Sequence, residues 1–230
     1  MGKLSSRKIL FLRIGIDLGC GGTLGPIYPD RTFEYVPIPD DPQNVSPKSL
    51  FYADIKSTYG GTLDQFIPKR FRNHPAHYDP EFETYTYGDP TKNKSRQLLH
   101  LKLDDILVFY AGLRPPGQNH GGRIYIIGYF EIKSVEEVYL TIHWPPTKFK
   151  HLFANAHFRR AEPDEGLVVV QGKHETSRLL IKAFLISDDD QYILPKMEEF
   201  LGIHGSLKRS IGRWVSEEKA NRVIEWLFKL

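Results

Sequence analysis

Cysteine is nearly absent from this sequence, and its basic and acidic residues almost balance. The 230 residues include one cysteine, Cys20, so no intramolecular disulfide can form, and we expect a cytoplasmic protein in a reducing environment. No apolar run is long enough to cross a bilayer, so no membrane partner is expected. The net charge is only +3, which permits a nucleic-acid partner but excludes binding that rests on broad neutralisation of phosphates.

Internal repeats and low-complexity segments are absent too, so nothing in the sequence divides the chain. Hydrophobic residues make up 40% of it and aromatic residues 13%, enough for a sizeable buried core at this length. We therefore expect residues 1–230 to form a single domain.

Glycine is concentrated in one short stretch, directly after an apolar run. Five of the eleven residues from position 15 to position 25 are glycines. Backbone this rich in glycine can take positive φ and approach a ligand closely. Arg13 and Asp17 flank the stretch, so we expect a polar pocket that tolerates anions, with Arg13, Gly21 and Gly22 binding the ligand.

Two familiar cofactor motifs resemble this glycine stretch, and neither fits. The segment 16–22 resembles the first motif of S-adenosylmethionine-dependent methyltransferases, in which a glycine-rich turn opens a helix. Pro26 and Pro29 follow too closely for a helix, so a methyltransferase is a lesser alternative. The dinucleotide-binding pattern fails because Leu24 stands where its third glycine belongs, and no phosphate-binding GK[ST] is present. The sequence therefore assigns no cofactor.

Runs of apolar and β-branched residues indicate strands at 7–16, 32–38, 103–110, 124–132 and 167–171, and a strand or a short helix at 177–187. Apolar residues three to four apart, after Ser216 as N-cap, indicate a helix from Ser216 to Phe228. The connections are too irregular for βαβ crossovers, so we expect an α+β fold with a mostly antiparallel, barrel-like sheet, flanking helices and a C-terminal helix. The strands around residues 103–132 also resemble PUA-like barrels, which include readers of modified bases, although a hairpin of any barrel gives the same pattern.

A second polar stretch, residues 69–89, is rich in turns and in ionisable side chains. His77 and Asp79 lie two residues apart, so on an extended chain they project to the same side and could contact one ligand. A metal site made of His74, His77 and Asp79 is conceivable, but their spacing is not specific, and an ordinary hydrogen-bonded loop explains it equally. We therefore assign no metal ligands.

Five blocks spread over nearly the whole chain resemble the nucleotide modification associated domain family, third type, whose members are described as candidate DNA base hypermodification proteins. The blocks are Arg13 with Asp17, Gly21-Gly22, Pro26-Ile27, Pro29-Asp30 and Pro37-Ile38-Pro39; residues 77–80; residues 105–110; residues 127–129; and His157 with residues 177–179. The chain departs from the family in a shorter spacing between His100 and Asp105 and in reading Ile-Gly-Ile before Asp17, where other members have Lys-Gly-Phe. The resemblance implies a context of DNA modification and adds His157 to the site. Arg178, in the last block, could reach a phosphate or Asp17, or form only a surface ion pair.

Three hypotheses about function follow. In the first, the protein modifies a base of a nucleotide or of DNA, with Asp17 or Asp79 as general base and His77 or His157 as proton shuttle. In the second, the pocket only reads a base, held by stacking on Tyr28, Tyr110, Tyr129 or Trp144. In the third, the chain is a structural partner of a larger system whose protein partners the sequence does not identify. The first predicts that Arg13, Asp17, His77, Asp79 and His157 meet in one cleft.

Overall fold

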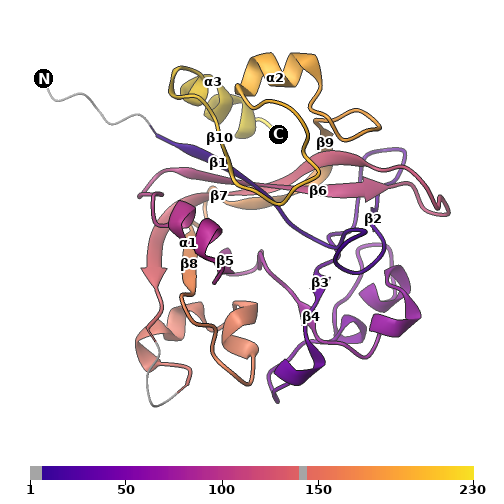
Figure 1. Ribbon diagram of the computed structural model, residues 1–230, viewed down its shortest axis with the longest axis vertical. Helices are drawn as coiled ribbons and strands as arrows, with labels where there is room; N and C mark the ends of the chain where they lie inside the picture. The colour runs from indigo at the N-terminus through magenta and orange to yellow at the C-terminus, as the bar shows by residue number, and fades with distance from the viewer. Residues whose placement is uncertain (1–6, 140–143) are drawn as a thin grey trace, which may run out of the picture.

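A large mixed sheet runs through the middle of the molecule (Figure 1). The computed structural model describes residues 7–139 and 144–230. The sheet has eight strands, in the order β10-β1-β6-β7-β8-β5, with β2 paired to β6 and β9 paired to β7. The strands are β1 (Ile9–Arg13), β2 (Gly25–Pro26), β5 (Thr86–Asp89), β6 (Ile106–Arg114), β7 (Arg123–Glu137), β8 (Val168–Gly172), β9 (Arg178–Leu185) and β10 (Arg213–Trp214).

The sheet departs from the expected antiparallel barrel in two ways. Strand β1 runs parallel to β6, pairing Ile9 with Ile106, and β2 is also parallel to β6. Within the described residues the strand order has two ends, β10 and β5, so the sheet is open and no closed barrel forms. The mixed α+β class is confirmed, whereas the barrel and the PUA-like arrangement are not. Pairing between strands almost a hundred residues apart leaves no local pattern, which is why the sequence did not reveal it.

Alternation along the strands creates a hydrophobic core on each face of the sheet. Ile9 and Phe11 belong to one core, and Leu10 and Leu12 to the other, because successive side chains point to opposite faces. The first core is covered by α2 (Pro195–Leu201) and α3 (Glu217–Leu227), which lie above the sheet in Figure 1. Helix α3 confirms the prediction of a C-terminal helix.

Two lobes lie below the sheet in Figure 1. The β4 lobe (residues 36–78, purple) contains the pair β3 (Ile38–Pro39) and β4 (Ala76–His77) and four short 3-10 helices, η1 to η4, at Pro42–Asn44, Tyr52–Asp54, Leu63–Phe66 and Lys69–Phe71. The η6 lobe (residues 144–167, salmon) contains the 3-10 helices η5 (Thr147–Leu152) and η6 (Ala156–Arg159). Helix α1 (Lys92–Leu98) follows β5. Each lobe has a small hydrophobic core of its own.

The chain between β1 and the β4 lobe is irregular. Residues 14–41 contain no helix, as the prolines predict, so the methyltransferase arrangement of a glycine turn opening a helix is not present. The predicted strand at 32–38 is wrong except for its last residue, Ile38, which belongs to β3. The backbone of residues 32–37 instead forms hydrogen bonds with separate segments. The Glu34 amide donates to the Pro26 carbonyl, and the Val36 carbonyl accepts from the Ile16 amide.

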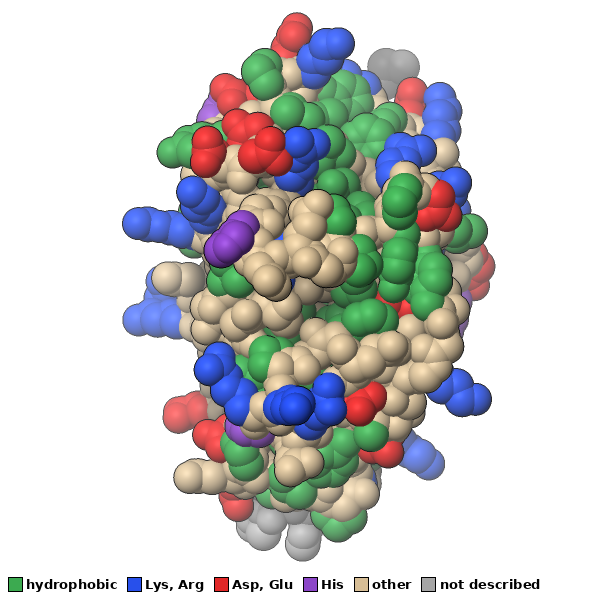
Figure 2. Space-filling view, turned by 90° about the vertical axis from the view of Figure 1, so that its right-hand side faces the viewer, with side chains coloured by type: hydrophobic (Ala, Val, Ile, Leu, Met, Phe, Trp, Pro, Cys, Tyr) green, Lys and Arg blue, Asp and Glu red, His purple; other side chains and the backbone are tan. Residues whose placement is uncertain are grey.

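The described helices are all too short or too polar to cross a bilayer. Acidic and basic side chains are interspersed over the face of the molecule shown in Figure 2. This distribution agrees with the small net charge of +3.

Candidate functional site

A cavity of about 350 Å³ lies between the two lobes and the sheet. Its walls come from the end of β1, the glycine stretch, β4, the segment from β5 into α1, and η6. The volume lies in the range typical of sites for small molecules. Arg13, Asp17, His77, Asp79 and His157, the five residues predicted to meet, all line this cavity.

Three of these residues form a compact buried group, here called the His–Asp–His cluster (His77, Asp79 and His157). The Oδ2 atom of Asp79 lies 3.6 Å from His157 Nε2 and 4.0 Å from His77 Nε2. The two imidazole rings meet edge to face, with centroids 4.6 Å apart. All three residues are buried, with at most 7% of their surface exposed.

Backbone and side-chain hydrogen bonds fix the carboxylate of Asp79. Asn155 Nδ2 donates to Oδ1 at 2.7 Å, and the Gly88 amide donates to Oδ2 at 3.0 Å. Asn155 also caps η6, since its side chain accepts from the His157 amide at 3.1 Å. One asparagine of the η6 lobe therefore orients both Asp79 and the helix that carries His157.

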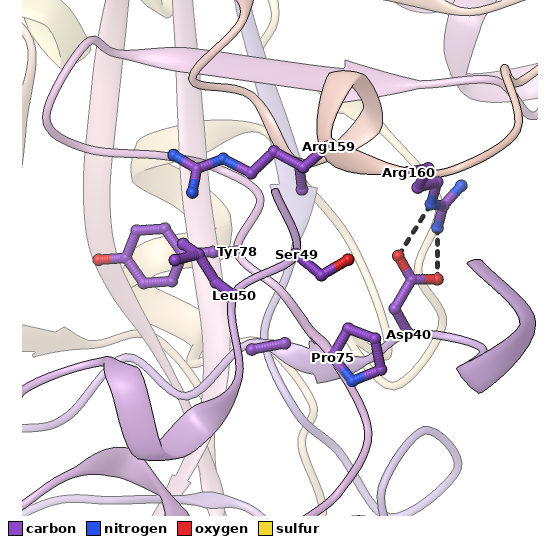
Figure 3. Close-up of a pocket in the computed structure, with 9 residues that line it drawn as sticks. Asp40, Ser49, Leu50, Pro75, Tyr78, Arg159 and Arg160 are labelled. Atoms are coloured by element: carbon purple, nitrogen blue, oxygen red, sulfur yellow. Dashed lines mark hydrogen bonds and ion pairs between the residues drawn. The ribbon is translucent and has the colours of Figure 1, made fainter. Parts of the chain in front are cut away.

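Each histidine of the cluster has a carboxylate on its other ring nitrogen. His157 Nδ1 lies 2.6 Å from Asp164, and His77 Nδ1 lies 3.4 Å from Asp40. Arg160 joins these two outer carboxylates: its Nε and Nη2 donate to Asp40 at 2.8 and 2.9 Å, and its Nη1 donates to Asp164 at 2.6 and 2.7 Å. Figure 3 shows the Arg160 guanidinium facing Asp40, while Arg159 points away from it.

The protonation of the two histidines is pushed in opposite directions. Burial alone would lower the pKa of His157, but its bonds to Asp164 and then to Asp79 outweigh that effect and raise the pKa to about 9. Burial lowers the pKa of His77, because its longer contact with Asp40 compensates only in part. The pKa of Asp40 and that of Asp164 are lowered, since the hydrogen bonds they accept from histidine and Arg160 overcome the effect of burial.

Arg13 and Asp17 are both held by neighbouring backbone. Arg13 Nη1 donates to the carbonyls of Leu207 and Lys208 at 3.0 and 2.7 Å, and its Nε lies 3.8 Å from Asp17 Oδ2. The other oxygen of Asp17 accepts from the amides of Gly19 and Cys20 at 2.8 and 2.6 Å. The expected pairing of Arg13 with Asp17 is present, and Asp17 also holds the glycine turn closed.

Three residues predicted to bind a ligand lie outside the lining of this cavity. Gly21 and Gly22 have φ of 121° and 73° and serve the turn; a Cβ on Gly21 would come within 2.4 Å of Ile16. Arg178 lies on β9, with its guanidinium 5.6 Å from the ring centre of Tyr129. The glycine pattern thus reflects a tight backbone path, and the structure gives these three residues no place in the cavity.

The aromatic residues proposed to stack on a base are also elsewhere. Tyr110 and Tyr129 are fully buried in the core beneath α2 and α3, Tyr28 packs on Tyr59, and Trp144 stacks on Phe158. None of the four is among the described residues that line the cavity, whereas Tyr87 is. His74 lies outside the cluster as well, with its ring against Phe71.

Sequence reasoning missed the residues that support the cluster: Asp40, Gly88, Asn155, Arg160 and Asp164. Asp40 directly follows the matched block 37–39, and Arg160 with Asp164 has the i,i+4 spacing of an ion pair, so those two signals were available. Gly88 and Asn155 act through a backbone amide and a helix cap, and neither carries a recognisable pattern.

The cluster can hold a metal ion as well as transfer protons. His77, Asp79 and His157 each offer one ligand atom, and these atoms lie within 4.8 Å of one another. No other group of three such residues in the described part of the chain meets that condition.

One comparison with known proteins identifies the chain. The family model described as nucleotide modification associated domain 3 matches residues 8–224. No curated protein and no solved structure matches this chain. Because the match covers nearly the whole chain, the protein belongs to the nucleotide modification associated domain 3 family.

Proposed function

We propose that this protein modifies a nucleobase, carried by a nucleotide or by DNA, in the cavity that the His–Asp–His cluster lines. The family is named for an association with nucleotide modification, which supplies the substrate class. The cavity of about 350 Å³ lies within the range of small-ligand sites and is open to a ligand from outside.

The observation that carries the proposal is the burial of two imidazoles and a carboxylate beside this cavity. Burying ionisable groups is costly unless they are paired, and functional sites are where such groups gather. Asp17 or Asp79 is the proposed general base and His77 or His157 the proposed proton shuttle, because carboxylates and imidazoles transfer protons near neutral pH.

Cationic side chains in the wall support a ligand that carries phosphate. Lys94 lines the cavity with its ammonium 2.9 Å from Asp89, and Arg13 lines it with an Nε atom that makes no hydrogen bond within the described residues. Either group could meet a phosphate, since guanidinium and ammonium both bind phosphate oxygens.

The alternative of a reader without catalysis has less support. A reader would hold the base by stacking on an aromatic ring, and the candidates were Tyr28, Tyr110, Tyr129 and Trp144. These four residues pack elsewhere among the described residues. Tyr87, the tyrosine that does line the cavity, uses its hydroxyl to bond Asp89.

Calorimetric titration with deoxynucleoside monophosphates and a short single-stranded oligonucleotide tests the proposal. We expect saturable binding by the wild type, weaker binding by Lys94→Ala, and unchanged binding by His204→Gln, an exposed histidine whose ring contacts Glu198. Mass spectrometry of nucleosides from cells that express the protein separates the two functions. A new nucleoside that disappears with Asp79→Asn supports modification, binding with no new nucleoside favours a reader, and no binding of either ligand refutes both.

A further inference from the structure

We propose that His77, Asp79 and His157 bind one divalent transition-metal ion through two imidazole nitrogens and one carboxylate oxygen. From the sequence we expect these three residues to meet in one cleft but assign them no metal, since His157 lies about eighty residues after His77 and no metal-binding spacing links the two. The inference deepens the proposed function and rests on it for what the ion acts on, while the ion site itself rests on the geometry.

The ligand atoms are already close to a binding arrangement. Bonds of about 2.0–2.2 Å to nitrogen and oxygen place neighbouring ligand atoms roughly 3.0–3.5 Å apart around an ion. The distances from Asp79 Oδ2 to the two Nε2 atoms, 3.6 and 4.0 Å, exceed this by a few tenths of an ångström. The three ligand atoms lie within 4.8 Å of one another, so rotation of the two imidazoles toward Asp79 would close the set around an ion.

The outer contacts match those that orient metal-binding histidines. Such a histidine nearly always gives its second ring nitrogen to a carboxylate or a carbonyl, which fixes its tautomer and leaves the first nitrogen free for the ion. Asp164 on His157 Nδ1 and Asp40 on His77 Nδ1 provide this contact twice, and both Nε2 atoms face Asp79. His157 Nε2 also lies 3.2 Å from the Gly88 carbonyl, a contact that ligation of an ion would replace. A histidine pair that served only packing would not need a carboxylate behind each ring.

The balance of charge points the same way. The cluster and its outer contacts contain three carboxylates, those of Asp40, Asp79 and Asp164, against the single guanidinium of Arg160. Without an ion, a proton on His157, whose pKa is raised to about 9, offsets one of these charges. Metal ligation requires neutral imidazoles, and the group then carries a net charge of −2, which needs compensation in a buried site. A divalent cation between the three ligands supplies that compensation in place of the proton.

Three protein ligands leave coordination positions open, as in catalytic rather than structural sites. The three ligands line the cavity, so those positions face the space proposed for the substrate. Nitrogen and oxygen ligands of this kind suit Zn²⁺, Fe²⁺ or Mn²⁺. With an ion bound, the cluster would act by ligation, and Asp17 would remain as the carboxylate available for proton transfer.

Metal titration of the full chain, freed of ions with a chelator and with no nucleotide added, tests the site. In separate titrations we expect one Zn²⁺ or one Co²⁺ to bind per chain, with visible absorption from the bound Co²⁺. Asp79→Asn and His157→Gln should weaken binding more than about 100-fold, and Asp164→Asn about 10–100-fold through the outer contact. The control His204→Gln, at an exposed histidine whose ring contacts Glu198, should bind as the wild type does, and circular dichroism should show that each variant is folded.

Absence of binding by the wild type, or equal affinity in folded Asp79→Asn and His157→Gln, would overturn the metal site. Nucleotide titrations with chelator present keep this outcome separate from the proposed function. A protein that binds nucleotide but no ion refutes the metal site alone. A protein that binds the ion at the cluster but no nucleotide supports the metal site and refutes the proposed substrate.

Discussion

Arg160 is the side chain on which the junction of the two lobes most depends, and replacing it tests the description of that junction. It extends from the end of η6 and bonds both Asp40, next to β3, and Asp164, in the η6 lobe. The substitution Arg160→Met keeps much of the apolar volume of the side chain and removes the guanidinium. Both carboxylates would then lose their guanidinium partner while partly buried, and Asp164 would keep its contact with His157.

The size of the effect follows from burial. Removing one partner of a buried ion pair costs roughly 3–5 kcal/mol, because the other charge stays in place without compensation. The side chains of Arg160, Asp40 and Asp164 are 16%, 9% and 20% exposed, so water screens part of that cost. We therefore expect Arg160→Met to lower the free energy of unfolding by about 3 kcal/mol, the lower end of that range.

The preceding residue provides a matched control. Arg159 is half-buried, and its guanidinium donates through Nε to the carbonyl of Ala154 at 3.0 Å. Arg159→Met should cost about 1 kcal/mol, the ordinary net value of one hydrogen bond. Urea unfolding of both variants in the presence of a chelator measures the two losses, with circular dichroism and tryptophan fluorescence as independent probes.

A rescue experiment separates loss of the bridge from loss of packing. Adding Asp40→Asn to Arg160→Met removes the carboxylate whose remaining histidine contact is the longer one, 3.4 Å to His77, so the double variant should regain part of the lost stability. Equal losses for Arg160→Met and Arg159→Met would refute the reasoning, because the bridge would then be worth no more than a surface ion pair.

Three further outcomes are expected. Gly88→Ala should lower the unfolding free energy by roughly 1–3 kcal/mol in a denaturant titration, because the added Cβ would lie 2.8 Å from His157 Cδ2; an unchanged midpoint would contradict this contact. Cys20 should be alkylated more slowly at pH 8 than a free thiol and faster in Asp17→Asn, because burial and then the charge of Asp17 raise its pKa, and equal rates would refute this. The stability difference between the wild type and Asp89→Asn should be constant above pH 5 and shrink as the pH falls below 3.8, because hydrogen bonds and a cation overcome burial and lower the pKa of Asp89 in the fold; acid titration of both proteins checks the sign.

The elements that sequence predicts well are those whose pattern is local. The continuous apolar run from Ile9 to Leu12 predicted β1, and the apolar spacing of Val223 and Leu227 predicted α3. The parallel pairing of Ile9 with Ile106 was missed because it depends on a partner 97 residues away. An open sheet and a closed barrel share the same strand patterns, so only the pairing distinguishes them.

The site residues also divide into those that a local sequence pattern predicted and those that depend on tertiary packing. His77 and Asp79 were found because their spacing of two predicts projection to one side, and His157 because it lies in a block that resembles the family. The residues behind them were missed, since Asp40 and Arg160 acquire a role only when η6 is packed against β4. Gly21 and Gly22 show the opposite case, in which a conspicuous pattern serves the path of the backbone and not the cavity.

The ion-pair network between the β4 lobe and the η6 lobe contributes less to folding stability than apolar packing would, and this supports a functional role for it. Well-packed apolar residues in place of a buried ion-pair network are often neutral or stabilising by about 1–4 kcal/mol. Here the β4 lobe and the η6 lobe each have only a small core, yet they meet through Asp40, Arg160, Asp164 and the His–Asp–His cluster. The two large cores on the sheet supply most of the buried apolar surface, so the fold can tolerate a destabilising junction below it. A charged network between two small lobes, which places two imidazoles against one carboxylate beside a cavity, therefore supports the proposal of chemistry in that cavity.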